Sequence, residues 1–119
     1  MIVTRCLAIV FILSSPSWAQ APKELVSPSP NSNAYFGRTV SMDSQRTVVG
    51  APGFGVIGRV FVFEKSQGWE NATELVSSRS AEGNGFGHAV SLSGDRLAIS
   101  ARNEGGRGSI TILQHDGQS

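Results

Sequence analysis

Short stretches of alternating polar and apolar residues dominate the chain from residue 39 onward. Residues 39–42 and 89–92 both alternate in this way, which is the period of two that is typical of a β-strand. Residues 46–51 and 96–101 carry apolar side chains at consecutive positions, as expected of strands that are covered on both faces. The pattern therefore predicts pairs of short strands separated by turns.

Two further kinds of strand complete the pattern. Residues 60–63 and 110–113 follow glycine-rich loops and are rich in Val, Ile and Phe, which favours a third strand in each half. Residues 71–76 carry Thr73 and Glu74 among apolar neighbours, which indicates a solvent-side edge strand. Beyond residue 19 no stretch has helical periodicity, so the sequence predicts an all-β fold.

The chain also repeats itself at a spacing of fifty residues. Residues 24–27 and 74–77 are identical, and no gap is needed to align the rest. Four strands in about fifty residues is the size of one β-propeller blade. The other identical pairs include Phe36 and Phe86, Gly37 and Gly87, Val40 and Val90, Ser41 and Ser91, Arg46 and Arg96, Ala51 and Ala101, and Gly58 and Gly108.

This repeat divides the chain into four parts. The prediction is a helical signal peptide at 1–19, an N-terminal strand and connector at 20–35, a first blade at 36–85 and a second blade at 86–119. The N-terminal strand aligns with the fourth strand of a blade, whereas the second blade lacks a fourth strand of its own. The fold class is thus two four-stranded propeller blades, either a partial propeller or one completed by oligomerisation.

The first nineteen residues have the features of a secretory signal. Arg5 precedes an apolar run at 6–13, and Ser17 and Ala19 provide small residues for cleavage after Ala19. The run is too short for a membrane span, which needs about twenty residues. Cys6, the only cysteine, leaves with the signal, so the sequence predicts a secreted chain, extracellular or periplasmic, without disulfides.

The motifs of the first unit resemble a known family. Phe36-Gly37, Val40-Ser41 and Val49-Gly50-Ala51-Pro52, followed by Gly58-x-Val60-Phe61-Val62-Phe63 and Trp69, are similar to an FG-GAP repeat. That repeat is the blade unit of the integrin alpha-subunit β-propeller and of many secreted bacterial proteins. The second unit keeps Phe86-Gly87, but Ser100-Ala101-Arg102 replaces its Gly-Ala-Pro signature. The resemblance covers residues 22–119 and implies the architecture, while propellers serve many functions.

Charge and acidic residues exclude two classes of ligand. Ten Lys and Arg stand against nine Asp and Glu, and the loss of Arg5 brings the charge to zero, so no basic excess is available for nucleic acid. Integrin-type units can carry an Asp-rich calcium loop, but Asp43, Asp95 and Asp116 are far apart in this chain. Calcium needs several clustered carboxylates. We therefore expect no metal, and a hairpin turn at Asp95.

The sequence offers no recognisable catalytic constellation. His88 aligns with Arg38, and His115 aligns with Lys65 at the solvent end of a strand. No serine lies in a nucleophile elbow, and the carboxylates of Glu64, Glu70, Glu74 and Glu104 have no spacing that marks a hydrolase pair. We expect no enzyme, no catalytic residue and no cofactor.

These observations favour a secreted binding or adhesion module that acts through loops on one propeller face, with an unknown protein or glycan ligand. One alternative is a fragment of a larger multi-blade protein, and another is an accessory domain of a secreted carbohydrate-active or other enzyme. Two blades cannot close a ring, since propellers have four to eight, so a homo-oligomer, most simply a trimer, is the expected partner. Trp69 is expected to fill a blade edge, and Asn71 begins a glycosylation sequon.

Overall fold

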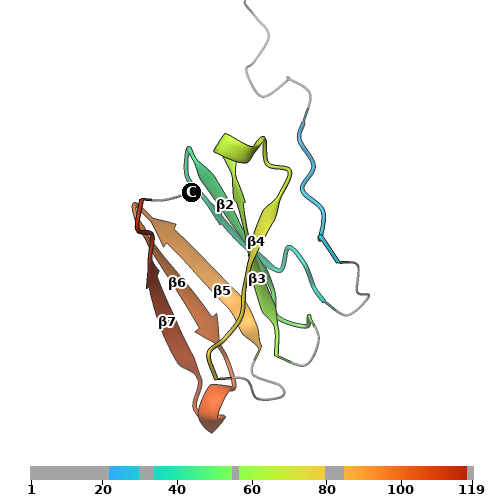
Figure 1. The fold of residues 1–119 in the computed structure, drawn as a ribbon. Coiled ribbons are helices and arrows are strands. Elements are labelled where there is room, and N and C mark those ends of the chain that lie inside the picture. Colours follow the sequence, from blue (N-terminus) through green and yellow to red (C-terminus); the bar gives the residue numbers. More distant parts are fainter. Residues whose placement is uncertain (1–21, 30–33, 55–56, 80–84, 118–119) are drawn as a thin grey trace, which may run out of the picture.

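A computed structural model describes residues 22–29, 34–54, 57–79 and 85–117 of the chain. They form two antiparallel sheets whose strands follow one another in chain order, and the sheets do not close into a ring (Figure 1). Sheet A contains β1 (Thr39–Met42), β2 (Arg46–Ala51), β3 (Arg59–Glu64) and β4 (Ala72–Leu75). Sheet B contains β5 (Phe86–Ser93), β6 (Arg96–Ala101) and β7 (Ser109–Gln114). The only helical turns in the described ranges are η2 (Lys65–Gln67) and η3 (Glu104–Gly106).

The all-β prediction and the positions of the strands are confirmed. The first hairpin turns at Asp43, whose Oδ1 accepts the backbone N–H groups of Gln45 and Arg46 at 2.8 and 2.7 Å. Asp favours such turns because its side chain accepts hydrogen bonds from backbone N–H groups nearby in the chain. The second hairpin turns at Gly94, which has a φ of 57° and is followed by Asp95 as expected.

One face of each sheet packs against the other sheet. Strand alternation sends Val48 and Val60 of sheet A toward sheet B, and sends Leu97, Ile99 and Ala101 of sheet B toward sheet A. Phe86 lies between them and is 1% exposed. Phe86 therefore packs between the two sheets, whereas its repeat counterpart Phe36 does not and lies on the outer face of sheet A.

The inner strands of the two sheets approach each other closely. A Cβ atom at Gly50 would lie 2.1 Å from the carbonyl oxygen of Gly87, so glycine is required there by the close approach. Beside it, Thr39 Oγ1 and Ser41 Oγ accept the backbone N–H groups of Val90 and Leu92, at 3.4 and 2.9 Å. Polar contacts therefore join the blades along β1 and β5.

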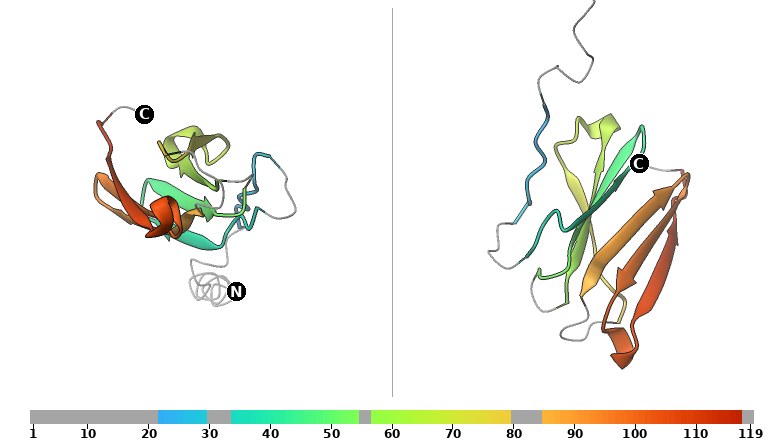
Figure 2. Two further views of the ribbon diagram at one scale, coloured as in Figure 1. Left: turned by 90° about the horizontal axis from the view of Figure 1, so that it is seen from below. Right: turned by 180° about the vertical axis from the view of Figure 1, so that it is seen from behind.

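The outer face of sheet A is covered by the chain that precedes β1. Phe36 stacks at a tilt on Phe61, with ring centroids 5.6 Å apart, and meets Phe63 edge-on. Leu25 and Ala34 pack against the same cluster, and Figure 2 shows the segment running beside sheet A, away from sheet B. Phe61 and Phe63 are therefore buried on the outer face of an open pair of sheets.

The expected N-terminal strand at 20–35 does not form where the structure describes that stretch. Residues 22–29 have no strand. Leu25 instead packs on the aromatic cluster of sheet A, and Lys23 pairs with Glu70. The reason is burial: an apolar side chain gains more on the aromatic face than at a solvated strand edge.

The outer face of sheet B stays open. Ile110 and Ile112 are 65% and 60% exposed, and they lie on this face because they pair with Ser100 and Ala98 in β6. Their counterparts fifty residues earlier, Val60 and Val62, face sheet B. The same kind of face is thus covered in the first blade and uncovered in the second.

The predicted signal peptide at 1–19 and its cleavage point lie outside the described residues. Within the described ranges no helix has the length and apolar character needed to cross a membrane.

Candidate functional site

The end of the molecule that carries the long loops is built from two copies of one turn. In the first blade the N–H of Arg38 donates to the carbonyl oxygen of Tyr35 at 3.0 Å, and in the second the N–H of His88 donates to that of Gly85 at 3.1 Å. We call this end the loop end; it is lowermost in Figure 1. The turns place Arg38 and His88 at equivalent points of neighbouring blades.

A hollow of about 330 Å³ opens between these two turns. Its lining consists of four pairs of positions fifty residues apart, so that each pair contributes one residue from each copy of the repeat. Gly85 is open beside Arg102, since a Cβ built on Gly85 would lie 3.9 Å from the Cβ of Arg102. The hollow therefore exists partly because glycine replaces tyrosine in the second blade. The pairs are Tyr35 and Gly85, Arg38 and His88, Pro52 and Arg102, and Gly53 and Asn103.

Tyr35 holds an unusual backbone conformation at the rim of this hollow. Its φ is 54°, and its repeat partner Gly85 has a φ of 66°. Glycine adopts this left-handed region freely, whereas a side chain costs about 1–2 kcal/mol there. The tyrosine is nevertheless 61% exposed, so burial of its ring does not compensate for that cost. Such strain at a surface hollow is a feature of functional sites.

The loop end also gathers arginines that have no acidic partner. Arg46, Arg59 and Arg96 each form an ion pair, but in the described part of the chain no ion pair forms at Arg38 or Arg102. Arg107 is likewise unpaired there and lines an adjoining hollow of about 400 Å³, which shares His88 and Arg102 with the first. The hollow of about 330 Å³ has no carboxylate in its described lining. This end therefore presents positive charge.

Glu104 is the acidic side chain nearest this region among the described residues, and it is committed to structure. It is 4% exposed, and the hydroxyls of Ser77 and Ser109 donate to its carboxylate. The Ser109 and Ser77 hydrogen bonds, with the charge of Arg79, hold the pKa of Glu104 below its usual value. Glu104 thereby fixes the loop before β7 while its charge faces inward.

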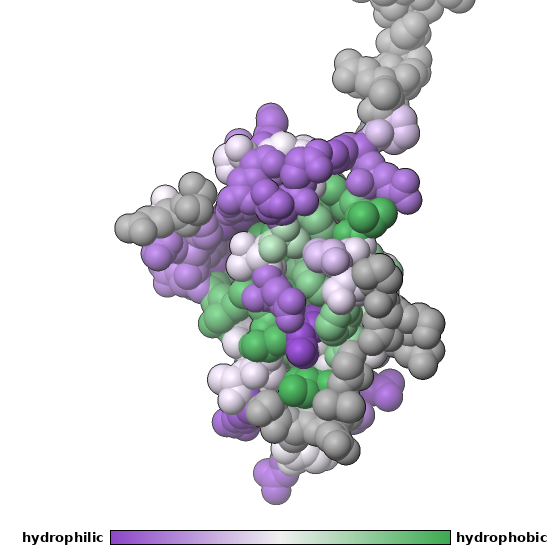
Figure 3. All heavy atoms as spheres, turned by 45° about the vertical axis from the view of Figure 1, so that its right-hand side comes forward, coloured by the Kyte–Doolittle hydropathy of each residue, from purple (hydrophilic) through white to green (hydrophobic). Residues whose placement is uncertain are grey.

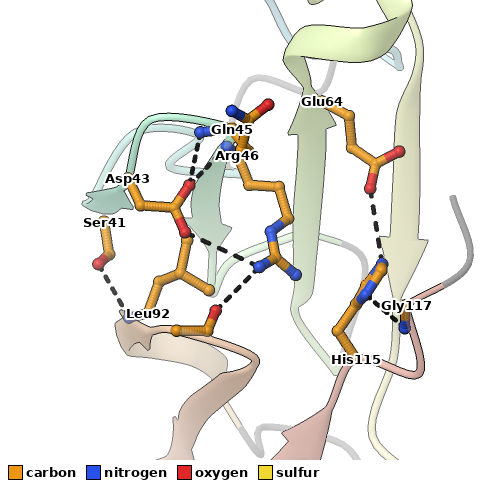
Figure 4. A network of polar contacts seen from close by, with 9 residues as sticks. Ser41, Asp43, Gln45, Arg46, Glu64, Leu92, His115 and Gly117 are labelled. Carbon is orange, nitrogen blue, oxygen red and sulfur yellow. Dashed lines mark hydrogen bonds and ion pairs between the residues drawn. The ribbon is translucent and has the colours of Figure 1, made fainter.

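A second cleft, of about 340 Å³, opens between the sheets at the opposite end. Its floor is apolar, with Val48, Val62, Leu75 and Leu97, and its mouth is polar. Figure 4 shows the contacts at this end. Arg46 reaches from β2 to the carbonyl oxygen of Gly94 at 2.8 Å, and so joins the two hairpin turns.

His115 and Glu64 also meet across this mouth. His115 Nε2 lies 3.8 Å from Glu64 Oε1, and His115 Nδ1 accepts the N–H of Gly117 at 3.0 Å (Figure 4). With Nδ1 accepting, the proton of a neutral ring sits on Nε2 and faces the carboxylate. Neither nitrogen is then free to take a proton from a substrate. The pair therefore ties the end of β7 to β3.

Apolar and hydrophilic residues occupy different parts of the surface. Figure 3 shows apolar residues at mid-height on one face and hydrophilic residues gathered at the end that carries η2. The two ends thus differ within the described ranges: at the end with the hairpin turns, here called the turn end, Arg46, Arg96 and His115 each lie beside a carboxylate, whereas at the loop end Arg38, Arg102 and Arg107 form no ion pair.

The structure does not bring the acidic residues weighed from the sequence into a site. Asp43 caps the first hairpin, and the N–H of Gln45, together with that of Arg46, holds the pKa of Asp43 below its usual value. Asp95 accepts a hydrogen bond from Gln114 at 3.1 Å. In the described ranges no three His, Cys, Asp or Glu residues cluster as metal ligands would.

Three other residues considered in the sequence analysis are Trp69, Asn71 and His88. Trp69 packs on the aromatic cluster of sheet A beside Ala72, as expected of an edge filler. Asn71 is exposed immediately before β4. His88, for which sequence analysis predicts no catalytic role, lines the loop-end hollow.

Sequence reasoning missed Tyr35, Arg38 and Arg102. The signal was present in the repeat, because these positions pair with Gly85, His88 and Pro52 at the fifty-residue spacing. The alignment of Arg38 with His88 was interpreted only as a position that accepts any polar residue. That the turns of two blades meet around one hollow is visible only in the folded chain.

Comparison with known proteins bears on the architecture. A family model described as the FG-GAP repeat matches residues 69–111, which run from Trp69 through β4, β5 and β6 into β7. No curated protein and no solved structure shows significant similarity to the chain. Residues 69–111 therefore match the FG-GAP repeat, the family that the motifs of the chain resemble, and they span parts of both antiparallel sheets.

Proposed function

We propose that this chain is a secreted, non-enzymatic binding module and that the loop end is its ligand-binding surface. The observation that carries the proposal is the loop-end hollow, whose lining comes in equal parts from the two blades. Loops held by a rigid scaffold are where binding residues concentrate. The paired sheets provide that scaffold, since their joint is sealed by Phe86 and Ile99.

Two further observations support binding rather than catalysis. Tyr35 stays exposed in a costly backbone conformation, and Arg38 and Arg102, which line the same hollow, form no ion pair with any residue that the structure describes. At the other end, the histidine that faces a carboxylate has its second nitrogen occupied by Gly117. The loop end is thus chemically available, while His115 is engaged in tying the blades together.

The experiment measures adsorption of the purified chain to a panel of immobilised extracellular polymers, both glycans and proteins, neutral and charged. Arg102→Gln is compared with Arg96→Gln. The two arginines stand at opposite ends of β6, and both are exposed. We expect binding to at least one polymer that falls in Arg102→Gln and persists in Arg96→Gln. Absence of all binding, or equal loss in both variants, would contradict the proposal.

The partner most compatible with the open face of sheet B is a second copy of the chain. Within one chain, the equivalent face of sheet A already packs against sheet B. The apolar positions of that face recur fifty residues later, because Ile110 corresponds to Val60 and Ile112 corresponds to Val62. On the outer face of sheet A, which the preceding segment covers over β2 and β3, Val40 and Met42 of β1 remain exposed at the edge. Ser100 stands at the position that corresponds to Gly50. Because serine has a side chain there, a second copy docks less closely on sheet B than sheet B docks on sheet A.

A further inference from the structure

We propose that the loop-end hollow binds a saccharide that carries a carboxylate or a sulfate group. This inference rests on the proposed function and names the ligand chemistry of the same surface. Its basis is the combination of an exposed aromatic ring with guanidinium groups at one hollow, formed by Tyr35, Arg38 and Arg102.

The guanidinium groups select an anion. Arginine presents several N–H donors in a planar fork that matches the oxygens of a carboxylate or sulfate. Arg38 and Arg102 line the same hollow from different blades, and Arg107 lines the adjoining one. Within the described ranges none of the three forms an ion pair, and all three residues are exposed. An anionic group in the hollow therefore gains charge-assisted hydrogen bonds without displacing an internal partner.

The tyrosine and the shape of the site favour a sugar as the carrier of that anion. Tyr35 offers an exposed ring with a polar tip, and a pyranose offers a flat patch of C–H groups rimmed by hydroxyls. Pro52 adds an apolar surface from the first blade. A volume of about 330 Å³ is at the small end of ligand sites, which suits one or two sugar units.

The charge distribution opposes a nucleic acid as the ligand. The whole chain carries a formal charge of only +1, and at the turn end Asp43, Glu64 and Asp95 line up beside the arginines and His115 that they pair with. A polyphosphate strand needs a continuous track of basic residues. Two arginines at the loop-end hollow and a third at the adjoining one provide a local anion site and no such track.

Calorimetric titration of the purified chain distinguishes these ligands. The probes are a hexagalacturonate, a sulfated dextran fragment, a neutral maltohexaose, sodium sulfate alone and a short DNA duplex. We expect at least one of the two acidic saccharides to bind at least tenfold more tightly than maltohexaose, with weakening at high salt. Binding of only one of them identifies the anionic group.

Three variants assign the binding to the hollow. Arg102→Gln should weaken the acidic saccharide about tenfold, and Arg96→Gln should not. Tyr35→Gly places the residue of the equivalent turn at a φ that glycine prefers, so it should weaken saccharide binding without lowering the thermal midpoint. An effect of Arg96→Gln equal to that of Arg102→Gln would overturn the inference.

Other outcomes also decide against it. Equal affinity for maltohexaose and the acidic saccharides at the loop end would refute the anionic ligand while leaving the proposed binding function intact. DNA binding tighter than that of either saccharide, or sulfate binding alone without saccharide, would refute the saccharide. Loss of every interaction, including those with the polymer panel, would remove the proposed function itself.

Discussion

At the scale of single residues, the buried carboxylate of Glu104 holds two segments of the chain together by hydrogen bonds. The carboxylate of Glu104 is almost fully buried, yet it is satisfied by the hydroxyls of Ser77 and Ser109. Two segments far apart in the chain, the stretch after β4 and the start of β7, thereby meet at one carboxylate. A buried charge is tolerated only with such partners, so Glu104 contributes to the order of the loop end.

Replacing Glu104 should change the acid sensitivity of the fold. Because its pKa is lowered in the folded state, the ionised carboxylate stabilises the fold above its ordinary pKa of 4.5, and this contribution is lost as pH falls through the lowered value. Glu104→Gln should therefore be less stable at pH 7, by about 1 kcal/mol, and its stability should fall less between pH 5 and pH 3 (roughly the range in which such a group titrates). Denaturant unfolding at several pH values measures this.

Glu24→Gln is the matched control, because Glu24 is exposed. Its unfolding free energy should follow the wild-type pH profile. Parallel profiles for wild type and Glu104→Gln would show that the buried carboxylate does not stabilise the fold through its charge.

Gly50 and Gly94 test two different reasons for glycine. Gly50→Ala places a Cβ against the Gly87 carbonyl oxygen and should destabilise by about 3 kcal/mol, the upper end of overpacking costs. Gly94 has open space around it and a φ of 57°, so Gly94→Ala should cost about 1 kcal/mol of backbone strain. Urea unfolding compares them, and an equal loss in both would mean that the sheets separate to admit the methyl group.

At the scale of elements, the joint between the sheets combines an apolar core with two hydrogen bonds from β5 amides to β1 hydroxyls, here called the polar seam. Phe86 and Ile99 fill the core, and the hydroxyls of β1 accept amide protons of β5. β5 is the edge strand of sheet B, so the amides of Val90 and Leu92 that do not pair with β6 reach the hydroxyls of β1. The two blades are therefore held as a unit by backbone contacts as well as by apolar burial.

Ser41→Ala removes one acceptor from that seam. The N–H of Leu92 then loses a partner at 2.9 Å in a partly buried position, which should cost about 1 kcal/mol. Ser91 is the equivalent residue of the second blade and is exposed, so Ser91→Ala should change stability by less than about 0.5 kcal/mol. Thermal unfolding of both variants tests the seam, and an effect of Ser91→Ala as large as that of Ser41→Ala would contradict it.

At the scale of the whole molecule, the two ends of the blade stack differ. The outer face of sheet A is closed by Leu25, Ala34 and Phe36, while the outer face of sheet B exposes Ile110 and Ile112. Exposed apolar faces of repeat units associate with partners. We therefore propose that the chain self-associates through this open face, by the side chains of β6 and β7.

Light scattering over a range of concentrations measures that association. We expect Ile112→Lys to shift the chain toward the monomer, because a charge would be buried in the contact. Ser100→Gly should strengthen association, since it restores the glycine that lets sheets A and B approach. Ser66→Lys, in the exposed turn η2, adds the same charge away from the face and serves as control. A chain that is monomeric at all concentrations, and unchanged by Ser100→Gly, would exclude the second copy.

The sequence by itself determined the strands, the hairpins and the repeat, because these depend on local patterns. Alternation sets the face of each strand, glycines and aspartates set the turns, and the fifty-residue spacing sets one blade. The place of Phe86 between the blades followed from the same repeat. Local chemistry was sufficient wherever residues close in the chain act on one another.

Only the tertiary structure decided how the blades and the N-terminal segment meet. Residues 22–29 matched a strand by sequence, yet they lie along sheet A because its aromatic face offers Leu25 more burial than a strand edge would. The loop-end hollow of Tyr35, Arg38 and Arg102 likewise arises when turns fifty residues apart come together. Such contacts depend on the packing of two sheets, and the residue pattern of a single strand does not show which residues of the other sheet it contacts.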